Sequence, residues 1–462
     1  MFNYSFWADE AYVSGVALQW ISGKLGFLQA FNSPGIAYQR LHMLTIALSF
    51  KIFGISEFSA RIPSAIVFII GIIAIYLLAK KMSNLWGGIV GAFLYTFSHL
   101  NLAYATQAKP YSALETIVLV VMLLLIKSQE IKSRKAVWCH AGIIILLSLA
   151  SGLHLIGGML WVLYFGFITA GVKVMNLKKL LPPVFAVLFI TVGILLAFDI
   201  RVVPEGIFRF NHLYQVVKLL AYKYTLVSLF SGLGFLWMFK KNRRLSYAVF
   251  AYACVVLLLA TFQQYIFNIR YVVSLFGILY LYFGIFWAKV GEYYLPKKAW
   301  LIPLLMIVVL YVTSYKIVRT PRVYYNPNID KYGDVQIANY REFYAKLKQR
   351  FPNFMKMYII SNIFDTEAWY MGRYSNAYFW KFTTTPYKHH TAGVYIYGTV
   401  KDFRTLIAKH PQGLLIMEDW QSFLPDDVKE YAKKNLKLEF RVESLKEAKD
   451  DPWPLALYSW GL

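Results

Sequence analysis

Long apolar runs separated by short polar loops occupy the first two thirds of the chain, a pattern typical of a helical membrane protein. A helix needs about 20 mostly apolar residues to cross the hydrocarbon core of a bilayer. We therefore predict ten membrane-spanning helices. They are Ile62–Ala79, Trp86–Leu102, Tyr111–Ile126, Val137–Leu153, Leu155–Val172, Leu180–Phe198, Val217–Phe239, Leu245–Phe262, Tyr271–Ala288 and Trp300–Tyr315.

Two apolar stretches before these spans have a different character. Residues 12–31 place Val13, Val16 and Trp20 mainly on one side, which predicts an interfacial helix. The run Leu41–Phe53 is short for a span, so we expect a second helix lying on the membrane. No basic segment with an apolar core precedes this region, and we expect an upstream span to be missing from the chain.

The composition changes near residue 320, where shorter alternating elements begin. The spacing predicts helices at Tyr340–Phe351, Val400–His410 and Pro425–Asn435. It predicts strands at Met357–Ile360, Val394–Tyr397, Leu414–Met417, Leu438–Val442 and Leu455–Tyr458. The predicted fold is thus a polytopic α-helical membrane protein with a C-terminal extracytoplasmic α/β domain. We divide it into an N-terminal segment (1–59), a membrane domain (60–316) and a small α/β domain (317–462).

Composition and charge agree with a membrane location. Of the 462 residues 58% are hydrophobic and 16% are charged, which argues against a soluble globule and against a disordered chain. The net charge is +24, and residues 1–316 hold 27 of the 48 basic residues but only 8 of the 24 acidic ones. Because the basic excess lies in the apolar part, we expect a lipid bilayer as partner and no nucleic acid. Cys139 and Cys254 lie in apolar stretches, so a disulfide framework is not expected.

The basic loops predict the orientation of the chain. One set of alternate loops carries 16 basic residues and the other set carries four, Lys109, Arg201, Arg209 and Arg270. Because loops rich in Lys and Arg stay in the cytoplasm, the N-terminal segment and the C-terminal domain are expected outside.

Two neighbouring acids stand at this outer surface. Asp9 and Glu10 lie between Trp7 and Tyr12, and partial desolvation at such an interface can raise a carboxyl pKa far enough for general-base work. The simpler alternative is that Asp9 is the N-cap of the helix that follows, and spacing alone favours that cap.

Cations at the outer span ends form a second group of candidates. Lys109 precedes Pro110, and Arg270-Tyr271 offers a planar fork that suits phosphate oxygens; Arg61 is a weaker third candidate. Snorkelling or interfacial anchoring is the alternative for each of them. His154 is a candidate ligand or proton shuttle, although a lone histidine is more often structural. The sequence has no P-loop, GxGxxG, CxxC or HExxH, so nucleotide, dinucleotide and zinc sites have no signal.

In this order, five pieces of the chain resemble the glycosyltransferase C superfamily, and most closely its family 39 protein mannosyltransferases and aminoarabinose lipid A transferases. The pieces are Phe6–Tyr12, Phe50–Ala65, the loop Tyr104–Tyr111, Gly152–His154 and Arg270-Tyr271. The family's loop has Tyr-x-x-Glu-x-Arg-Pro-Tyr, so Gln107 stands where a Glu is usual, which weakens a metal or second-acid role there. Asn32–His42 also departs from the family's Pro-Pro-rich segment.

The resemblance implies an inverting membrane glycosyltransferase with a polyprenyl-phosphate sugar donor, in a cytoplasmic membrane of bacterial or archaeal type. Asp9 would be the catalytic base, Glu10 its companion, and Lys109 and Arg270, with Tyr271 and Arg61, would bind the donor phosphate. Tyr104, Gln107, Tyr111 and His154 are further site candidates. The acceptor (lipid, glycan or protein), the hexose or pentose transferred and the need for a divalent metal stay open. Glu115, Lys218 and Lys223 are the deep ionisable residues that a rival transporter or flippase would need.

Overall fold

The structure, a computed structural model, describes residues 5–33, 36, 38–131, 135–171, 212–220, 224–262, 269–313, 338–389, 393–418, 424–443 and 454–462. It divides into two compact units. Unit 1 contains Met1–Ile66, Leu102–Pro110 and Pro321–Leu462, and unit 2 contains Val67–Asn101 and Tyr111–Thr320. Unit 1 therefore joins three segments that are far apart in the sequence.

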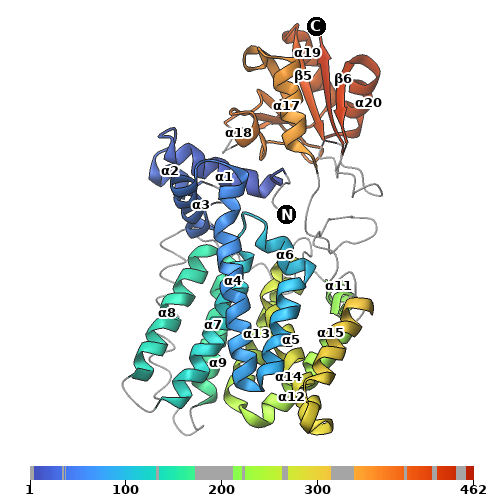
Figure 1. Cartoon of the computed structure of the whole chain (residues 1–462). Coiled ribbons are helices and arrows are strands. Elements are labelled where there is room, and N and C mark those ends of the chain that lie inside the picture. Colours follow the sequence, from blue (N-terminus) through green and yellow to red (C-terminus); the bar gives the residue numbers. More distant parts are fainter. Residues whose placement is uncertain are drawn as a thin grey trace. The chain divides into compact units, whose positions relative to one another are not determined.

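The membrane domain is helical, as predicted (Figure 1). Among the described residues, five helices are long and apolar enough to cross a membrane: α4 (Glu57–Met82), α7 (Tyr111–Glu130), α8 (Lys135–Leu153), α13 (Arg243–Phe262) and the stretch Val273–Tyr294, which contains η5 (Val273–Leu275) and α14 (Phe276–Tyr294). Shorter apolar helices are α5 (Leu85–Phe97), η1 (Leu155–Met159) with α9 (Leu160–Ala170), and α15 (Leu301–Thr313). The predicted span Leu180–Phe198 lies outside the described residues.

The remaining elements of the membrane domain are α6 (His99–Ala105), α11 (Leu213–Lys218), α12 (Thr225–Lys241), η4 (Ile269–Tyr271) and η6 (Pro296–Lys298). Glycines let three of the helices approach closely. A Cβ added to Gly284 of α14 would lie 2.6 Å from the Gly87 carbonyl oxygen of α5, and one added to Gly234 of α12 would collide with the Tyr282 carbonyl. Small residues at helix contacts are a common packing device inside membranes, where apolar surface alone does not drive association.

The N-terminal segment folds into three helices, α1 (Ala8–Ile21), α2 (Phe27–Phe31) and α3 (Arg40–Phe53). The prediction of one helix over 12–31 is wrong: α1 begins four residues earlier, and the chain turns at Gly23, whose φ is +74°. A glycine takes this left-handed conformation without steric penalty, so the break is local in origin. The helix predicted at Leu41–Phe53 is confirmed.

The C-terminal domain is a three-layer α/β structure. Its described strands form one sheet in the order β3-β4-β2-β1-β5-β7-β6, with β1, β2, β4 and β5 parallel and β3, β7 and β6 antiparallel to their neighbours. All five predicted strands and three predicted helices are confirmed; β2 and β3 were missed because they are only three and two residues long. The elements are α17 (Tyr340–Arg350), η7 (Phe354–Lys356), β1 (Tyr358–Ser361), α18 (Glu367–Tyr370), β2 (Ala377–Phe379), β3 (Tyr387–Lys388), β4 (Tyr395–Tyr397), α19 (Val400–Lys409), β5 (Gly413–Glu418), α20 (Asp426–Asn435), β6 (Lys437–Val442) and β7 (Leu455–Trp460).

Each face of this sheet has its own hydrophobic core. Alternate residues of a strand point to opposite faces, so Ile360 packs with Phe403 of α19 and Val428 of α20. Ile359 faces the other way and shares a core with Phe343 of α17. This second core continues into the N-terminal segment, where Phe6, Ala11, Tyr12, Val13 and Val16 of α1 and its approach belong to the same cluster.

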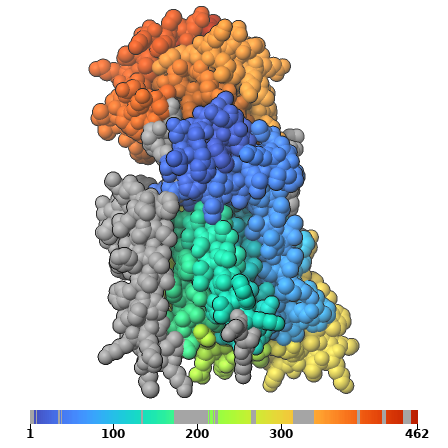
Figure 2. Space-filling model, turned by 90° about the vertical axis from the view of Figure 1, so that its left-hand side faces the viewer, coloured from blue at the N-terminus to red at the C-terminus, as the bar shows by residue number. Residues whose placement is uncertain are grey.

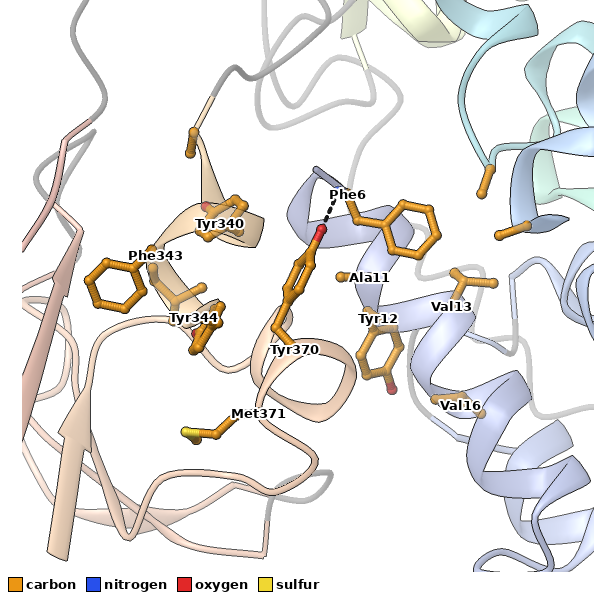
Figure 3. Packing of buried hydrophobic residues seen from close by; sticks show 14 of the residues in the cluster. Phe6, Ala11, Tyr12, Val13, Val16, Tyr340, Phe343, Tyr344, Tyr370 and Met371 are labelled. Atoms are coloured by element: carbon orange, nitrogen blue, oxygen red, sulfur yellow. Dashed lines mark hydrogen bonds between the residues drawn. The ribbon is translucent and has the colours of Figure 1, made fainter. Parts of the chain in front are cut away.

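Figure 3 shows this shared core from close by, with Tyr370 and Met371 on one side and the α1 side chains on the other. The Tyr370 hydroxyl accepts the backbone N–H of Phe6. In the space-filling view of Figure 2 the N-terminal helices, in blue, lie directly against the orange part of the C-terminal domain. The sheet domain is thus packed onto the segment that carries Asp9 and Glu10.

Candidate active site

The two neighbouring acids lie in the first turn of α1. The helix has Trp7 at its N-cap, and the backbone N–H of Trp7 donates to Glu10 Oε2 at 3.2 Å. The alternative in which Asp9 is the N-cap is therefore wrong, because Asp9 is already inside the helix. Negative charge in this turn is favoured by the exposed amide groups of the helix end.

Glu10 is buried and fully engaged. Its carboxylate forms a two-point contact with Arg61 of α4, Oε1 with Nε at 3.0 Å and Oε2 with Nη2 at 3.1 Å. Oε1 also accepts the backbone N–H of Ala108 at 2.7 Å. The side chains of Glu10 and Arg61 are only 3% and 2% exposed. This buried, bidentate pair connects α1, α4 and the loop 102–110. Because the Arg61 guanidinium is engaged by Glu10, Arg61 is poorly suited to the predicted phosphate contact.

Asp9 has a different environment one residue earlier. Its Oδ2 lies 3.2 Å from the Lys109 ammonium, and its side chain is 39% exposed whereas that of Lys109 is 4% exposed. The Ser64 hydroxyl donates a hydrogen bond to the Lys109 backbone carbonyl at 2.8 Å. The Lys109 ammonium lies 5.8 Å from the centre of the Trp7 ring. Asp9 is therefore an accessible carboxylate that a buried cation keeps in place.

The loop 102–110 adds polar groups around Lys109. His42 of α3 is hydrogen-bonded to the Ala108 backbone, and burial, together with the nearby Lys109 charge, lowers its pKa to about 4, so its ring is neutral at neutral pH. Tyr104 and Gln107 are buried. Neither amide atom of Gln107 has a hydrogen-bond partner in the part of the chain that the structure describes. Buried polar atoms normally have partners, so the Gln107 amide is an exception among the described residues.

The structure adds one acid that the sequence did not single out. Asp365 follows strand β1, and its carboxyl group interacts electrostatically with Asp9 and with Lys109. Burial, reinforced by the like charge of Asp9, raises the pKa of Asp365 to about 8. One signal was present in the sequence: polar residues after a predicted buried strand are where α/β sheets bind ligands.

The other predicted site residues belong to unit 2. The rings of Tyr111 and His154 lie 5.5 Å apart, and His154 Nδ1 accepts the backbone N–H of Ile156 at 3.1 Å at the start of η1. The guanidinium of Arg270 packs over the Tyr271 ring at 5.3 Å, with Nη2 at 3.4 Å from the Tyr271 hydroxyl. His154 therefore has a local capping role, and the Arg270 guanidinium contacts both the ring and the hydroxyl of Tyr271.

The described residues contain no group of three or more His, Cys, Asp or Glu side chains that could hold a metal ion.

The chain is similar to known proteins in sequence and in fold. Residues 41–198 match the family of dolichyl-phosphate-mannose-protein mannosyltransferases. ArnT from Cupriavidus metallidurans in the apo state superposes with a TM-score of 0.58 at 13% identity, covering 99% of this chain and 94% of that one. The chain has the glycosyltransferase C fold. The resemblance found in the sequence is thereby confirmed.

Two further structures are similar to the chain. ArnT from the same organism bound to undecaprenyl phosphate gives a TM-score of 0.56 at 13% identity, with the same coverage of 99% and 94%. The apo oligosaccharyltransferase of Archaeoglobus fulgidus gives 0.56 at 11% identity over 95% of this chain and 70% of that one. No curated protein matches the sequence. These comparisons support an integral membrane protein of the glycosyltransferase class.

Proposed function

We propose that the chain is an inverting glycosyltransferase that moves a sugar from a polyprenyl-phosphate donor to an acceptor hydroxyl at the extracytoplasmic face of the membrane. The observation that carries the proposal is the difference between the two acids of α1. Glu10 is buried and bound by Arg61 and Ala108, whereas Asp9 is 39% exposed and pairs with the Lys109 ammonium. An accessible carboxylate on a rigid support is what a general base requires.

The reaction then follows from these groups. Asp9 accepts the proton of the acceptor hydroxyl, whose oxygen attacks the anomeric carbon from the side opposite the phosphate. The new carbon–oxygen bond forms as the bond to the phosphate oxygen breaks, and the electron pair leaves with the polyprenyl phosphate. Lys109 pairs with the Asp9 carboxylate at 3.2 Å and holds it in position before the transfer.

The leaving phosphate gains negative charge during this step, and cations are the groups that stabilise it. Arg270 carries a planar guanidinium beside the Tyr271 hydroxyl, a geometry suited to two phosphate oxygens. In this proposal Arg270 and Tyr271 bind the donor, Lys109 contributes charge, and Glu10 with Arg61 positions Asp9. The donor class is supported by the match to mannosyltransferases that use a dolichyl phosphate and by the ArnT structure with undecaprenyl phosphate.

The test is sugar transfer in vesicles that contain the full chain and a labelled polyprenyl-phosphate sugar, with products identified by mass. We expect Asp9→Asn to lower the transfer rate by about 100-fold or more, because general-base catalysis contributes about 10²–10⁴-fold. Glu342→Gln is the matched control: this acid sits in an exposed ion pair with Lys346 at 2.7 Å, and its loss should leave the rate unchanged.

Unchanged transfer by Asp9→Asn would remove the assigned base. Movement of the labelled lipid across the vesicle membrane without any transferred product would instead favour a transporter or flippase. Labelling of the N-terminal segment from the cytoplasmic side alone would contradict the outer-face location.

A further inference from the structure

We propose that Asp365, supplied by the C-terminal domain, is an acceptor-binding residue of the Asp9 site, and that it selects acceptors whose reacting hydroxyl has a second oxygen beside it, as sugars do. The inference rests on the proposed function. It makes the sheet domain part of the catalytic site instead of an accessory.

Ring contacts on both sides fix the position of Asp365. Its neighbour Phe364 meets the Tyr12 ring edge-on, with ring centres 6.5 Å apart. Trp369, four residues after Asp365, packs on Phe6 and on Phe50, with ring centres 4.9 Å and 5.7 Å apart. These contacts hold the segment after β1 against α1, the residues just before it and α3.

Helix geometry places Asp9 at the same contact. Asp9 and Tyr12 are three residues apart in α1, so their side chains lie on one face of the helix. Tyr12 is the residue that Phe364 contacts, and Asp365 follows Phe364 directly. The electrostatic interactions of Asp365 with both Asp9 and Lys109 agree with this placement.

Two other buried acids of the C-terminal domain, Glu367 and Glu418, already accept hydrogen bonds from neighbouring side chains. Glu367 accepts the Ser375 N–H and hydroxyl, each at 2.7 Å, as well as the Tyr378 hydroxyl. Glu418 accepts the Tyr340 hydroxyl. By contrast, Asp365 is only partly buried, and the groups that act on its carboxyl electrostatically include Asp9 and Lys109 of the proposed site.

Two close carboxyl groups cannot both be ionised at low energy. Lys109 pairs with Asp9 at 3.2 Å, whereas burial and the like charge of Asp9 raise the pKa of Asp365 to about 8, so Asp365 keeps its proton at neutral pH. A neutral carboxylic acid both donates and accepts a hydrogen bond. While Asp9 receives the reacting hydroxyl, Asp365 can donate to an oxygen on the adjacent carbon of the acceptor, and the pair recognises a diol.

The nearby side chains suit such a ligand. Trp7, Tyr12 and Phe364 supply aromatic surface, and the Gln107 amide supplies a buried polar group with no partner among the described residues. A few directed polar groups on an otherwise apolar lining are typical of small-molecule sites.

The experiment compares two soluble probe acceptors, methyl glucoside and cyclohexanol, with the labelled polyprenyl-phosphate donor and the full chain in vesicles. We expect the unaltered protein to prefer methyl glucoside. Asp365→Ala should raise the KM for methyl glucoside roughly tenfold or more, the effect of one lost hydrogen bond in a partly buried site, while the donor KM and the rate with cyclohexanol stay within about twofold.

Asp365→Asn provides a readout that a purely structural role would not give. The amide keeps a donor and an acceptor, so this variant should lose less than Asp365→Ala at pH 7. In the unaltered protein, transfer to methyl glucoside should fall as the pH rises through about 8, where Asp365 ionises beside Asp9, Glu367 and Glu418. Asp365→Asn should lack this fall. Asp426→Asn, an exposed acid of α20, is the control that should match the unaltered protein in every respect.

The outcomes separate this inference from the function on which it rests. No transfer to any acceptor by the unaltered protein overturns the proposed function and this inference with it. Transfer with no preference for methyl glucoside, or with unchanged acceptor KM in Asp365→Ala, overturns only the role of Asp365. Equal loss with both acceptors in Asp365→Ala, with a lowered unfolding midpoint, would show that Asp365 is structural.

Discussion

At the scale of single residues, burial assigns different roles to two adjacent acids. The Glu10 carboxylate accepts four hydrogen bonds and is almost fully buried, so its role is to hold α1, α4 and the loop 102–110 together. Asp9 has the Lys109 ammonium and keeps access to solvent. The same chemical group is thus an anchor at one position and a candidate base at the next.

The anchor role leads to a prediction on stability. Removing Arg61 leaves the buried Glu10 charge without its main partner, and breaking a buried ion pair typically costs about 3–5 kcal/mol of unfolding free energy. We expect Arg61→Ala to lower the thermal unfolding midpoint of the solubilised protein markedly and to reduce sugar transfer as α1 loosens.

The double variant Arg61→Met with Glu10→Gln should recover much of this loss, since it removes both charges and keeps similar volume. If the double variant is as unstable as Arg61→Ala, the ion pair is not what holds α1 in place.

At the scale of elements, the contact of α1 with α18 is what brings the C-terminal domain to the site. Gly15 lies at this contact: a Cβ added there would be 3.5 Å from the Ala368 Cβ and 3.9 Å from the Trp369 backbone nitrogen. A methyl group therefore fits in ordinary contact, and a longer side chain does not.

This spacing predicts opposite results for two substitutions. Gly15→Ala should be tolerated or slightly stabilising, because alanine favours a helix by about 1 kcal/mol over glycine. Gly15→Leu should force α18 away, lower the unfolding midpoint by the equivalent of about 1–3 kcal/mol and reduce acceptor use. Both are measured by thermal unfolding and by transfer in vesicles.

Gly232 of α12 is the control for this pair, because a Cβ added there meets nothing within 4 Å. Gly232→Leu should behave like the unaltered protein. Full acceptor use by Gly15→Leu would mean that the domain does not depend on this contact.

At the scale of the whole molecule, unit 1 combines chain segments from both ends and the middle of the sequence around buried acids. Glu57 at the start of α4 accepts the Tyr370 hydroxyl at 2.6 Å and pairs with Arg341 of α17, so the C-terminal domain is fastened to the N-terminal part by polar contacts as well as by the shared core.

The buried acids predict how stability depends on pH. Burial raises the pKa of Glu367 and of Glu418 to about 7, well above the value of about 4.3 expected when unfolded. Between these values the folded state binds more protons than the unfolded state, so stability falls as the pH rises from about 4.5 to 7. The unfolding midpoint should follow this slope, and Glu418→Gln should flatten it, since the amide stays neutral. A slope unchanged in Glu418→Gln would show that Glu418 is not protonated in the folded protein.

The sequence by itself determined the membrane helices, most of the C-terminal strands and the candidates Asp9, Glu10, Lys109 and Arg270. Apolar runs and strand periodicity are local properties, and the rarity of acids before residue 316 draws attention to the few that occur. It also indicated the fold, which the similarity to ArnT confirmed.

Only the tertiary structure decided which cation meets which acid. Lys109 and Arg61 were both predicted to bind phosphate, and the structure places them against Asp9 and Glu10, because the loop 102–110 and α4 fold back onto α1. Asp365 is 356 residues from Asp9 in the sequence, so no local pattern could pair them. That pairing depends on a hydrophobic core shared by both ends of the chain. Packing between residues so far apart in the sequence cannot be predicted from any short stretch of residues.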